Sequence, residues 1–241
     1  GSVRGALPPY SIGHAKVDAW TPPLPIPTGA QRGLSAPINN FAMEVMVDAL
    51  ATQNAMSPFE FRRSNLGNQH PRLTAVLNKL ESVLPPEESE SMGRGIACGI
   101  YKGVSFVAIA ADVRVDQQQN SISVTKLTCV HECGLIVNPN SVEAQVQGNL
   151  IWGMGLALKE DLKTANHQVT SRNFDDYKIM TQNDTPEMDI HLLHRNDLPP
   201  AGAGEAAMMP VPAAIANGVF DATGIRLTHL PLTLPSHQSN S

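Results

Sequence analysis

Apolar residues recur at three- and four-residue steps along several stretches of the chain, which is the spacing of amphipathic helices. Ser57 followed by Pro58 matches an N-cap and the first position of a helix, so a short helix PFEFRRSNL is expected to begin there. A helix near the C-terminal end opens with proline and is expected to close at Gly224. The predicted helical segments are residues 37–66 with the new start at Ser57, 71–83, 141–160 and 210–223.

Between residues 94 and 137 the apolar positions alternate or run together, as they do in the strands of a sheet. Three strands are predicted there, GRGIACGIYKG, VSFVAIAADVRVD and SISVTKLTCVHECG, with DQQQN as the turn between the last two. One more strand is expected at 187–194, and HAKVDAW at 14–20 is expected to form a short strand in a proline-rich, extended surface segment. Helices mixed with mostly antiparallel strands indicate the α+β fold class.

The polar stretch PPEESESMGRG at 85–95 is the best candidate for an internal boundary. Residues 1–90 then hold the proline-rich entry segment, an Arg-Gly loop and the first helices. Residues 91–241 form the strand-rich part, with a helix around Gln145 and a glycine-rich loop before Glu205.

Composition excludes several classes of protein. The chain has 241 residues, 42% of them hydrophobic and 16% charged, as in ordinary globular domains. The net charge is −5 and no Lys/Arg run exceeds two residues, so a nucleic-acid partner is not expected. No apolar stretch reaches about eighteen residues and the N-terminal end does not resemble a signal. We therefore expect no direct membrane span and no targeting signal in this chain, and a cytoplasmic or periplasmic location set by a partner.

The three cysteines are Cys98, Cys129 and Cys133, an odd number without paired spacing, which argues against a disulfide framework. Cys129, His131 and Cys133 alternate in TCVHECG and would share one face of a strand. A zinc or iron–sulfur site needs about four ligands, and no second cluster supplies the rest. We therefore interpret them as buried small residues and assign no metal ligand to this chain.

Glu205 is the strongest candidate for a reactive side chain. It follows the glycine-rich stretch PAGAGE, and no other charged residue occurs before Asp221. Desolvation in such surroundings would raise the pKa of the carboxyl group and make it a usable base near neutral pH. The simpler interpretation is a carboxylate at a helix N-terminus, stabilised by free backbone N–H groups. The residues alone leave both interpretations open.

Three motifs resemble those of the molybdenum hydroxylases, the family of xanthine dehydrogenase, aldehyde oxidoreductases and bacterial N-heterocycle dehydrogenases. They are QRGLSAPINNFAMEVMVDALA, CGLIVNPNSVEAQVQGNLIWGMGLAL, and GAGE followed by PVPAAIANGVFDATGIRLTHLPL. In the first, Arg32, Gly33, Pro37 and Glu44 reproduce the family's spacing. With FEFRRSNL and NFDDYKIMT, the resemblance covers nearly the whole chain, and it is closest to the isoquinoline- and nicotinate-type and membrane-associated aldehyde dehydrogenase large subunits. It implies the α+β molybdenum-cofactor-binding fold of the xanthine-oxidase type, with 1–90 and 91–241 inside one large subunit.

The resemblance also implies roles for single residues. Glu205 would face the molybdenum and act as the active-site base, and Gly204 would belong to the same cofactor-binding loop. Gln145 would lie by the pterin, where an amide can both donate and accept hydrogen bonds. Arg32 and Gly33 would line the molybdenum pocket, and a planar guanidinium suits an anionic or oxygen-rich group. Without the resemblance, Gln145 is an ordinary helix residue, and Arg32 is a loop arginine paired with a nearby carboxylate.

The chain departs from the family in what it lacks. A glycine–glutamine–glycine turn and a small-residue loop that hold the cofactor in xanthine dehydrogenase have no counterpart, and there is no cysteine set for iron–sulfur clusters. We therefore expect the molybdenum–molybdopterin cofactor to be shared with a second large-subunit chain across an apolar interface of roughly 2,000 Å² or more. A small subunit with 2Fe-2S clusters is expected to take the electrons.

The preferred hypothesis is an oxidoreductase subunit, active only in a complex, that helps to hydroxylate an N-heterocycle or to oxidise an aldehyde with water-derived oxygen. The main alternative is a non-catalytic assembly or scaffold subunit of such a complex. A small-molecule-binding domain acting alone is a third alternative, which the incomplete pocket disfavours. Neither the substrate nor the electron acceptor follows from these residues.

Overall fold

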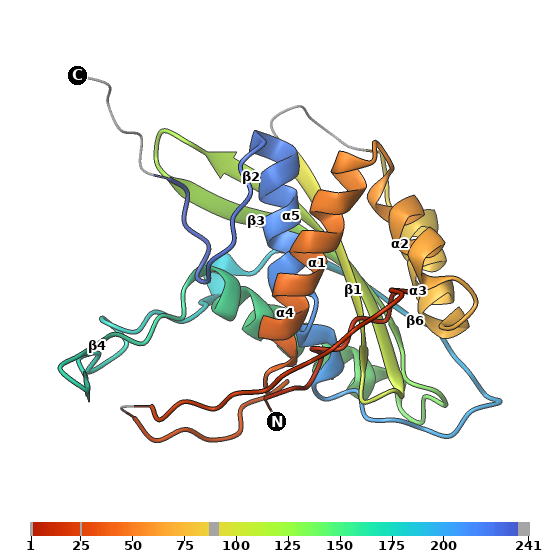
Figure 1. Ribbon diagram of the computed structural model, residues 1–241, viewed down its shortest axis with the longest axis horizontal. Helices are drawn as coiled ribbons and strands as arrows, with labels where there is room; N and C mark the ends of the chain where they lie inside the picture. Colours follow the sequence, from red (N-terminus) through yellow and green to blue (C-terminus); the bar gives the residue numbers. More distant parts are fainter. Residues whose placement is uncertain (1, 25, 87–91, 236–241) are drawn as a thin grey trace.

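A computed structural model describes residues 2–24, 26–86 and 92–235 of the chain (Figure 1). The helices are α1 (Ala36–Gln53), α2 (Pro58–Leu66), α3 (Pro71–Val83), α4 (Pro139–Leu158) and α5 (Val211–Thr223). The main strands are β1 (Met92–Tyr101), β2 (Ser105–Asp116), β3 (Ser121–Glu132) and β6 (Glu187–Leu192). A two-residue pair, β4 (Thr164–Ala165) and β5 (Gln168–Val169), and two short 3-10 turns, η1 (Gln182–Asp184) and η2 (Ala206–Met208), complete the described elements.

The four main strands form one sheet in the order β1-β2-β3-β6. The first three are antiparallel neighbours, and β6 runs parallel to β3 after the long excursion through α4 and the β4–β5 pair. Val107 of β2 pairs with Gly99 on one side and with His131 on the other. The α+β class with a mostly antiparallel sheet is confirmed.

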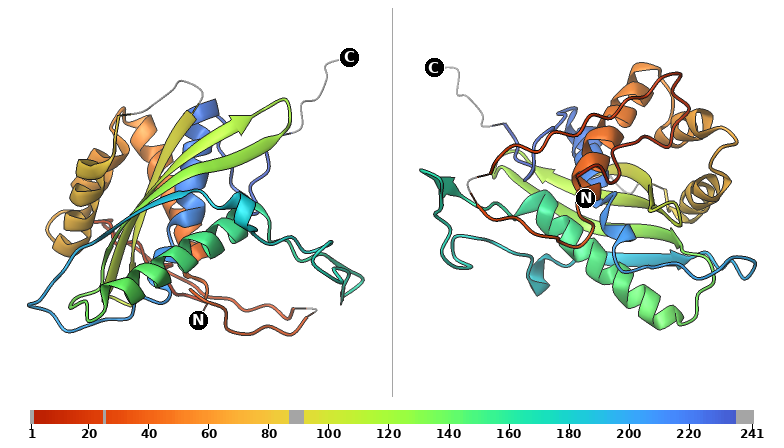
Figure 2. Two further views of the ribbon diagram at one scale, coloured as in Figure 1. Left: turned by 180° about the vertical axis from the view of Figure 1, so that it is seen from behind. Right: turned by 60° about the horizontal axis from the view of Figure 1, so that its bottom comes forward.

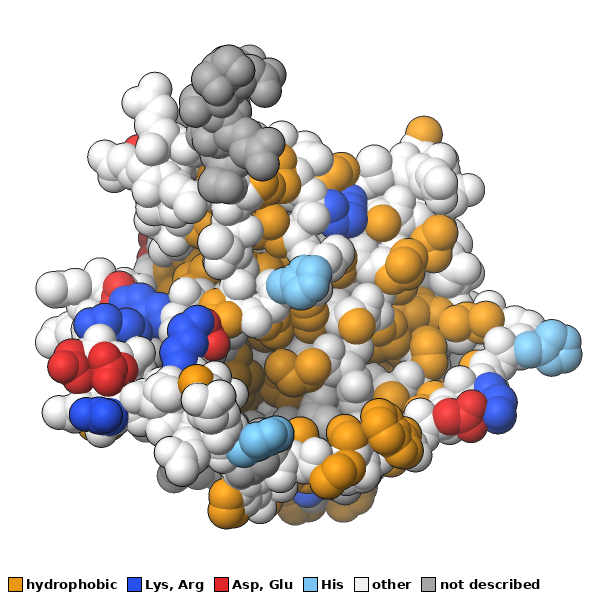
Figure 3. All heavy atoms as spheres, turned by 60° about the vertical axis from the view of Figure 1, so that its left-hand side comes forward, with side chains coloured by type: hydrophobic (Ala, Val, Ile, Leu, Met, Phe, Trp, Pro, Cys, Tyr) orange, Lys and Arg blue, Asp and Glu red, His pale blue; other side chains and the backbone are white. Residues whose placement is uncertain are grey.

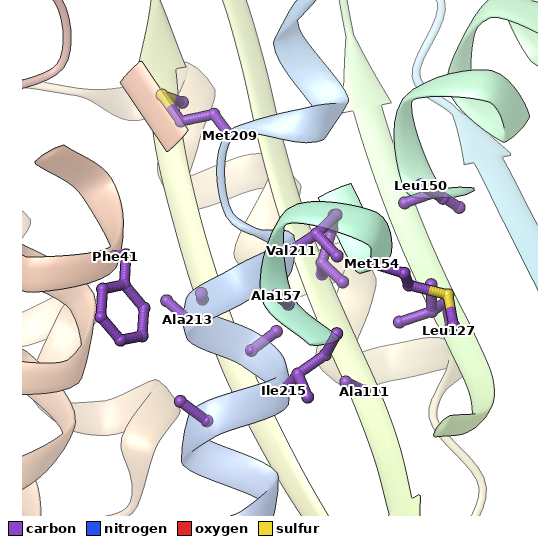
Figure 4. Close-up of a cluster of buried hydrophobic side chains, with 14 of the residues drawn as sticks. Phe41, Ala111, Leu127, Leu150, Met154, Ala157, Met209, Val211, Ala213 and Ile215 are labelled. Carbon is purple, nitrogen blue, oxygen red and sulfur yellow. The ribbon is translucent and has the colours of Figure 1, made fainter. Parts of the chain in front are cut away.

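Helices cover both faces of the sheet (Figures 1 and 2). Helix α5 packs on β1 and β2, with α1 on its outer side and α4 next to it, while α3 packs on the opposite face. Neighbouring residues of a strand therefore enter different cores: Val107 belongs to the α5 side and Ala108 to the α3 side. Figure 4 shows the first core, where Phe41 of α1, Ile215 of α5 and Met154 of α4 converge.

Glycines let α5 lie directly on the backbone of β1. A Cβ atom on Gly95 would lie 2.0 Å from both the Ala214 carbonyl oxygen and the Gly218 nitrogen, and one on Gly93 would lie 2.1 Å from the Gly218 oxygen. No side chain fits at such distances, so the stretch GRG is required for this contact. The close approach fixes α5, and with it the loop that precedes α5, relative to β1.

The local signals at helix ends are confirmed. The Ser57 side chain accepts a hydrogen bond from the Glu60 amide, as an N-cap does, and α3 occupies the predicted residues. Helix α5 ends at Gly224, whose φ of 72° is the left-handed conformation that glycine adopts readily. The predicted loop at 85–95 falls partly on residues 87–91, outside the described residues, and so does the division at residue 90, which stays a prediction.

The strand expected for HAKVDAW is wrong. Residues 14–20 form an exposed coil; Lys16 pairs with Asp18 at the surface, and Trp20 is 82% exposed. Alternation of apolar and polar residues indicates a strand only where a sheet edge is available to pair with it. The described part of the sheet offers this segment no such edge.

Hydrophobic side chains also gather at the surface, around a hollow on the face shown in Figure 3. A groove of about 570 Å³ runs along α1, with Ile38, Met46 and Leu230 among its lining residues. Among the described helices, none combines the length and the hydrophobicity needed to cross a bilayer.

Candidate active site

Glu205 lies where three segments meet. It ends the loop that follows β6 and directly precedes η2. Its Oε2 atom accepts hydrogen bonds from the Gly33 amide at 3.0 Å and from the Tyr101 hydroxyl at 2.9 Å, while its Oε1 atom lies 3.5 Å from Lys102 Nζ. The carboxylate therefore joins the Arg-Gly loop before α1 to the end of β1. It makes no side-chain cap for η2, so the interpretation as a helix N-terminal carboxylate does not describe its role.

The environment of Glu205 lowers its pKa, contrary to the expectation from the sequence. Burial raises the pKa of this carboxyl, but the hydrogen bonds from Tyr101 and Gly33 and the charge of Lys102 together outweigh burial. The side chain remains 35% exposed, which limits the effect of desolvation. Apolar neighbours in sequence predicted a dry carboxylate, but the fold surrounds it with donors from elsewhere in the chain.

The Arg-Gly loop is shaped by its glycine. Gly33 has a φ of 80°, and the next residue, Leu34, also has a positive φ of 55°, so the chain turns sharply before α1 begins at Ala36. A Cβ on Gly33 would lie 3.0 Å from the Pro37 side chain. The turn directs the Gly33 N–H at Glu205.

Arg32 extends from this loop to α4. Its guanidinium lies over the Trp152 ring at 5.3 Å, and Nη1 lies 3.2 Å from the position of a Cβ on Gly148. Within the described residues no carboxylate lies within 4 Å of this guanidinium, so the interpretation as a paired loop arginine is not supported. An open groove of about 930 Å³ adjoins it, lined by Gln31, Gly148, Trp152 and Tyr177 among others.

Gln145 and Gly204 lie next to each other. The side-chain oxygen of Gln145, which is on the exposed face of α4, lies 3.6 Å from the position of a Cβ on Gly204. One turn further, the buried Asn149 amide donates to the carbonyl oxygens of Gln145 at 2.7 Å, Gly204 at 3.2 Å and Ala203 at 3.4 Å. Asn149 therefore holds the loop that carries Glu205 against α4.

The five residues predicted from the motifs thus lie along one edge of the molecule, linked by Gly33–Glu205, Arg32–Gly148 and Gln145–Gly204 proximities. Glu44, from the same motif as Arg32, lies elsewhere, fully buried against Arg62. The structure adds Tyr101, Lys102 and Asn149, which the sequence motifs did not indicate. Asn149 was detectable as a polar residue on the apolar face of a predicted helix, but nothing local connects Tyr101 with a loop a hundred residues away.

The TCVHECG segment lies under this edge, in β3 and just beyond it. Cys129, His131 and Cys133 are all buried, and the cysteines are free. Burial raises the pKa of the Cys133 thiol and lowers the pKa of His131 to about 4. In the part of the chain that is described, no cluster of three His, Cys, Asp or Glu side chains is arranged to hold a metal ion.

Two family profiles match the chain, both described as molybdopterin cofactor-binding domain, over residues 3–66 and 85–186. A nicotinate dehydrogenase large chain of Pseudomonas putida is 33% identical over 95% of this chain and 21% of its own length. The beta subunit of isoquinoline 1-oxidoreductase from Brevundimonas diminuta is 29% identical over 96% of this chain and 30% of its own. A membrane-bound aldehyde dehydrogenase of Gluconacetobacter polyoxogenes is 29% identical over 92% and 32%, respectively. The chain thus spans a fifth to a third of these relatives.

Solved structures share the fold at low sequence identity. Quinoline 2-oxidoreductase from Pseudomonas putida 86 superposes with a TM-score of 0.77 and 17% identity, over 85% of this chain and 52% of that one. The aldehyde oxidoreductase of Desulfovibrio desulfuricans gives 0.71 and 18%, over 84% and 40%. With the two profile matches and the related sequences, these findings show that the chain belongs to the molybdopterin-cofactor-binding subunits of the xanthine oxidase family.

Proposed function

We propose that this chain forms one wall of the molybdenum site of an oxidoreductase, and that Glu205 is the base of the reaction. The observation that carries the proposal is the contact between Glu205 Oε2 and the Gly33 amide. That contact unites two motif loops separated by 172 positions, and it leaves the other carboxylate oxygen without a backbone donor among the described residues. A carboxylate held by one oxygen and accessible at the other is suited to general base catalysis.

The residues around Glu205 fit a pterin cofactor with an anionic tail. The Arg32 guanidinium has no carboxylate partner among the described residues, and the buried Oδ1 of Asn149 has no hydrogen-bond partner there. Gln145, exposed beside Gly204, offers an amide donor and acceptor. We propose that Arg32 and Gln145 hold the cofactor, with Gly33 and Gly204 allowing its close approach to the backbone.

When bound, the molybdenum cofactor supplies the two-electron oxidation and the activated water oxygen. The chain's own part is then to orient Glu205 and to move one proton. The lowered pKa keeps Glu205 ionised at neutral pH, so the carboxylate can accept a proton without first losing one. The half-exposed Lys102, 3.5 Å from Oε1, offsets the negative charge of the resting carboxylate.

The names of the relatives suggest the substrates. They are a nicotinate dehydrogenase, an isoquinoline oxidoreductase and an aldehyde dehydrogenase. We propose that the substrate is an N-heterocycle or an aldehyde, both of which present an electron-poor C–H carbon to water-derived oxygen. We further propose that another large-subunit chain completes the cofactor pocket, that a subunit with 2Fe-2S clusters takes the electrons, and that these partners set the compartment.

Replacement of Glu205 by Gln in the assembled complex tests the proposal. The amide has the shape of the carboxylate but cannot accept a proton, so kcat/KM should fall by about 10²–10⁴-fold. Molybdenum and pterin content should remain at the wild-type level. Glu81→Gln, which alters a surface ion pair with Arg63, is the matched control and should keep full activity.

Retained activity in Glu205→Gln would show that Glu205 is not the base. A wild-type complex that contains this chain but neither molybdenum nor turnover would favour the alternative, a scaffold subunit without a catalytic role.

A further inference from the structure

We propose that Tyr101 is a positioning residue for Glu205: together with the Gly33 amide it occupies Oε2 and leaves Oε1 as the atom that takes the proton. This inference rests on the proposed function of Glu205 as a base. It assigns a role to a side chain that lies outside all three sequence motifs.

The first argument is the division of contacts between the two carboxylate oxygens. Both hydrogen bonds, from the Gly33 amide at 3.0 Å and from the Tyr101 hydroxyl at 2.9 Å, end on Oε2. A carboxylate oxygen has two lone-pair sites, so two donors fill Oε2. Oε1 faces only the Lys102 ammonium, at 3.5 Å, among the described residues. Lys102 is 51% exposed and free to move away, so Oε1 is the accessible oxygen.

The second argument is the direction of the Tyr101 hydroxyl. Arg4 Nη1 lies 3.4 Å from this hydroxyl and can only donate, and its guanidinium lies 5.4 Å from the centre of the Tyr101 ring. The single proton of Tyr101 is therefore directed at Glu205. Partial burial and the hydrogen bond to Glu205 raise the pKa of Tyr101, so it remains a donor throughout the neutral range.

The third argument is the rigidity of the backbone that carries Tyr101. The residue ends β1 and is followed by a tight turn in which Lys102 and Gly103 both have positive φ angles, 53° and 72°. The turn closes with a hydrogen bond from the Val104 amide to the Tyr101 carbonyl. The fully buried Ser105 then donates to the Gly202 carbonyl at 2.8 Å. The hairpin is thus joined to the loop that carries Glu205, and the distance between Tyr101 and Glu205 is fixed.

The groups facing Glu205 come from three places: Tyr101 and Lys102 on the hairpin, Gly33 on the Arg-Gly loop, and Arg4 behind Tyr101. Of the side chains among them, only Tyr101 is both uncharged and hydrogen-bonded to Oε2. Loss of its hydroxyl removes one donor to the ionised form without changing any formal charge. The pKa of Glu205 should then rise, since a hydrogen bond to the ionised form favours that form.

The test is Tyr101→Phe in the assembled, cofactor-loaded complex. The acidic limb of the pH dependence of kcat/KM should move to higher pH by about one unit, and kcat should change more than KM. A second readout does not need turnover. In protein labelled with ¹³C-carboxyl glutamate, the infrared carboxylate band that disappears in Glu205→Gln should titrate at higher pH in Tyr101→Phe.

Tyr177→Phe is the matched control, because Tyr177 also donates to a glutamate, Glu160, at 2.9 Å. It should leave both the acidic limb and the Glu205 band at their wild-type pH. An unchanged limb and band in Tyr101→Phe, with turnover still abolished in Glu205→Gln, would refute the role of Tyr101 and leave Glu205 as the base. Retained turnover in Glu205→Gln would instead refute the proposed function itself, whatever the infrared titration shows.

Discussion

Arg62 and Glu44 form an ion pair inside the protein, with Nε and Oε2 2.9 Å apart and both side chains fully buried. Arg62 also donates to the Ile96 carbonyl at 2.9 Å, and the Cys98 amide donates to Glu44 Oε2 at the same distance. Asp48 lies 3.7 Å from Arg62 Nη1. The pair therefore connects α1, α2 and β1, and it explains Glu44 in the Arg-Gly motif as a structural residue.

Replacement of Arg62 by Leu should strongly destabilise the fold. It leaves the Glu44 carboxylate buried without its cation, a loss worth about 3–5 kcal/mol. Urea unfolding followed by circular dichroism measures the change. The neighbouring Arg63 pairs with Glu81 at the surface, so Arg63→Leu should cost less than about 1 kcal/mol. Equal effects of the two substitutions would contradict this account of the core.

Replacement of Asn149 by Ala should loosen the loop before Glu205. The side chain of Asn149 donates to the carbonyls of Ala203 and Gly204, and a hydrogen bond of this kind contributes about 1 kcal/mol. Amide hydrogen exchange at 201–206 should therefore become several-fold faster, in proportion to that loss. Asn65→Ala removes a similar bond, to the Phe61 carbonyl in α2, and is the control that should leave 201–206 unchanged. Unaltered exchange in Asn149→Ala would show that other contacts hold the loop.

The buried His131 should make the protein acid-sensitive. Neither ring nitrogen has a hydrogen-bond partner among the described residues, and burial lowers the pKa of His131 to about 4, partly opposed by Glu132. The unfolded chain binds this proton near pH 6.5 and the folded chain only near pH 4, so stability is lost as pH falls through that window. The total loss from this group is roughly 3 kcal/mol.

His131→Leu removes that proton and keeps an apolar side chain of similar size in the core. Unfolding free energies measured in urea from pH 7 to pH 4 should fall less steeply in this variant than in the wild type. Glu132 also loses stability in acid because Arg72 and the Gly134 amide lower its pKa, although burial acts in the opposite direction. The comparison is therefore the difference between variant and wild type at each pH, and parallel curves would rule out a contribution from His131.

The sequence by itself determined the elements and the loops between them. Helix starts at proline, the glycine after α5 and the alternating strands are local features, set by φ preferences and by side-chain periodicity. The motif residues Arg32, Gly33, Gln145, Gly204 and Glu205 could likewise be selected by their spacing along the chain. Local patterns fail where partners are needed, as at 14–20, where an alternating segment has no sheet edge to join.

Only the tertiary structure decided the chemistry around Glu205. Its donors come from Gly33 and Tyr101, 172 and 104 positions away, and their sum reversed the pKa direction expected from its apolar sequence neighbours. Hydrogen bonds and charges act over a few ångströms in space, whatever the separation along the chain. The contact of α5 with the glycines of β1 places this loop beside the Arg-Gly turn, and that placement follows from packing, which sequence periodicity does not encode.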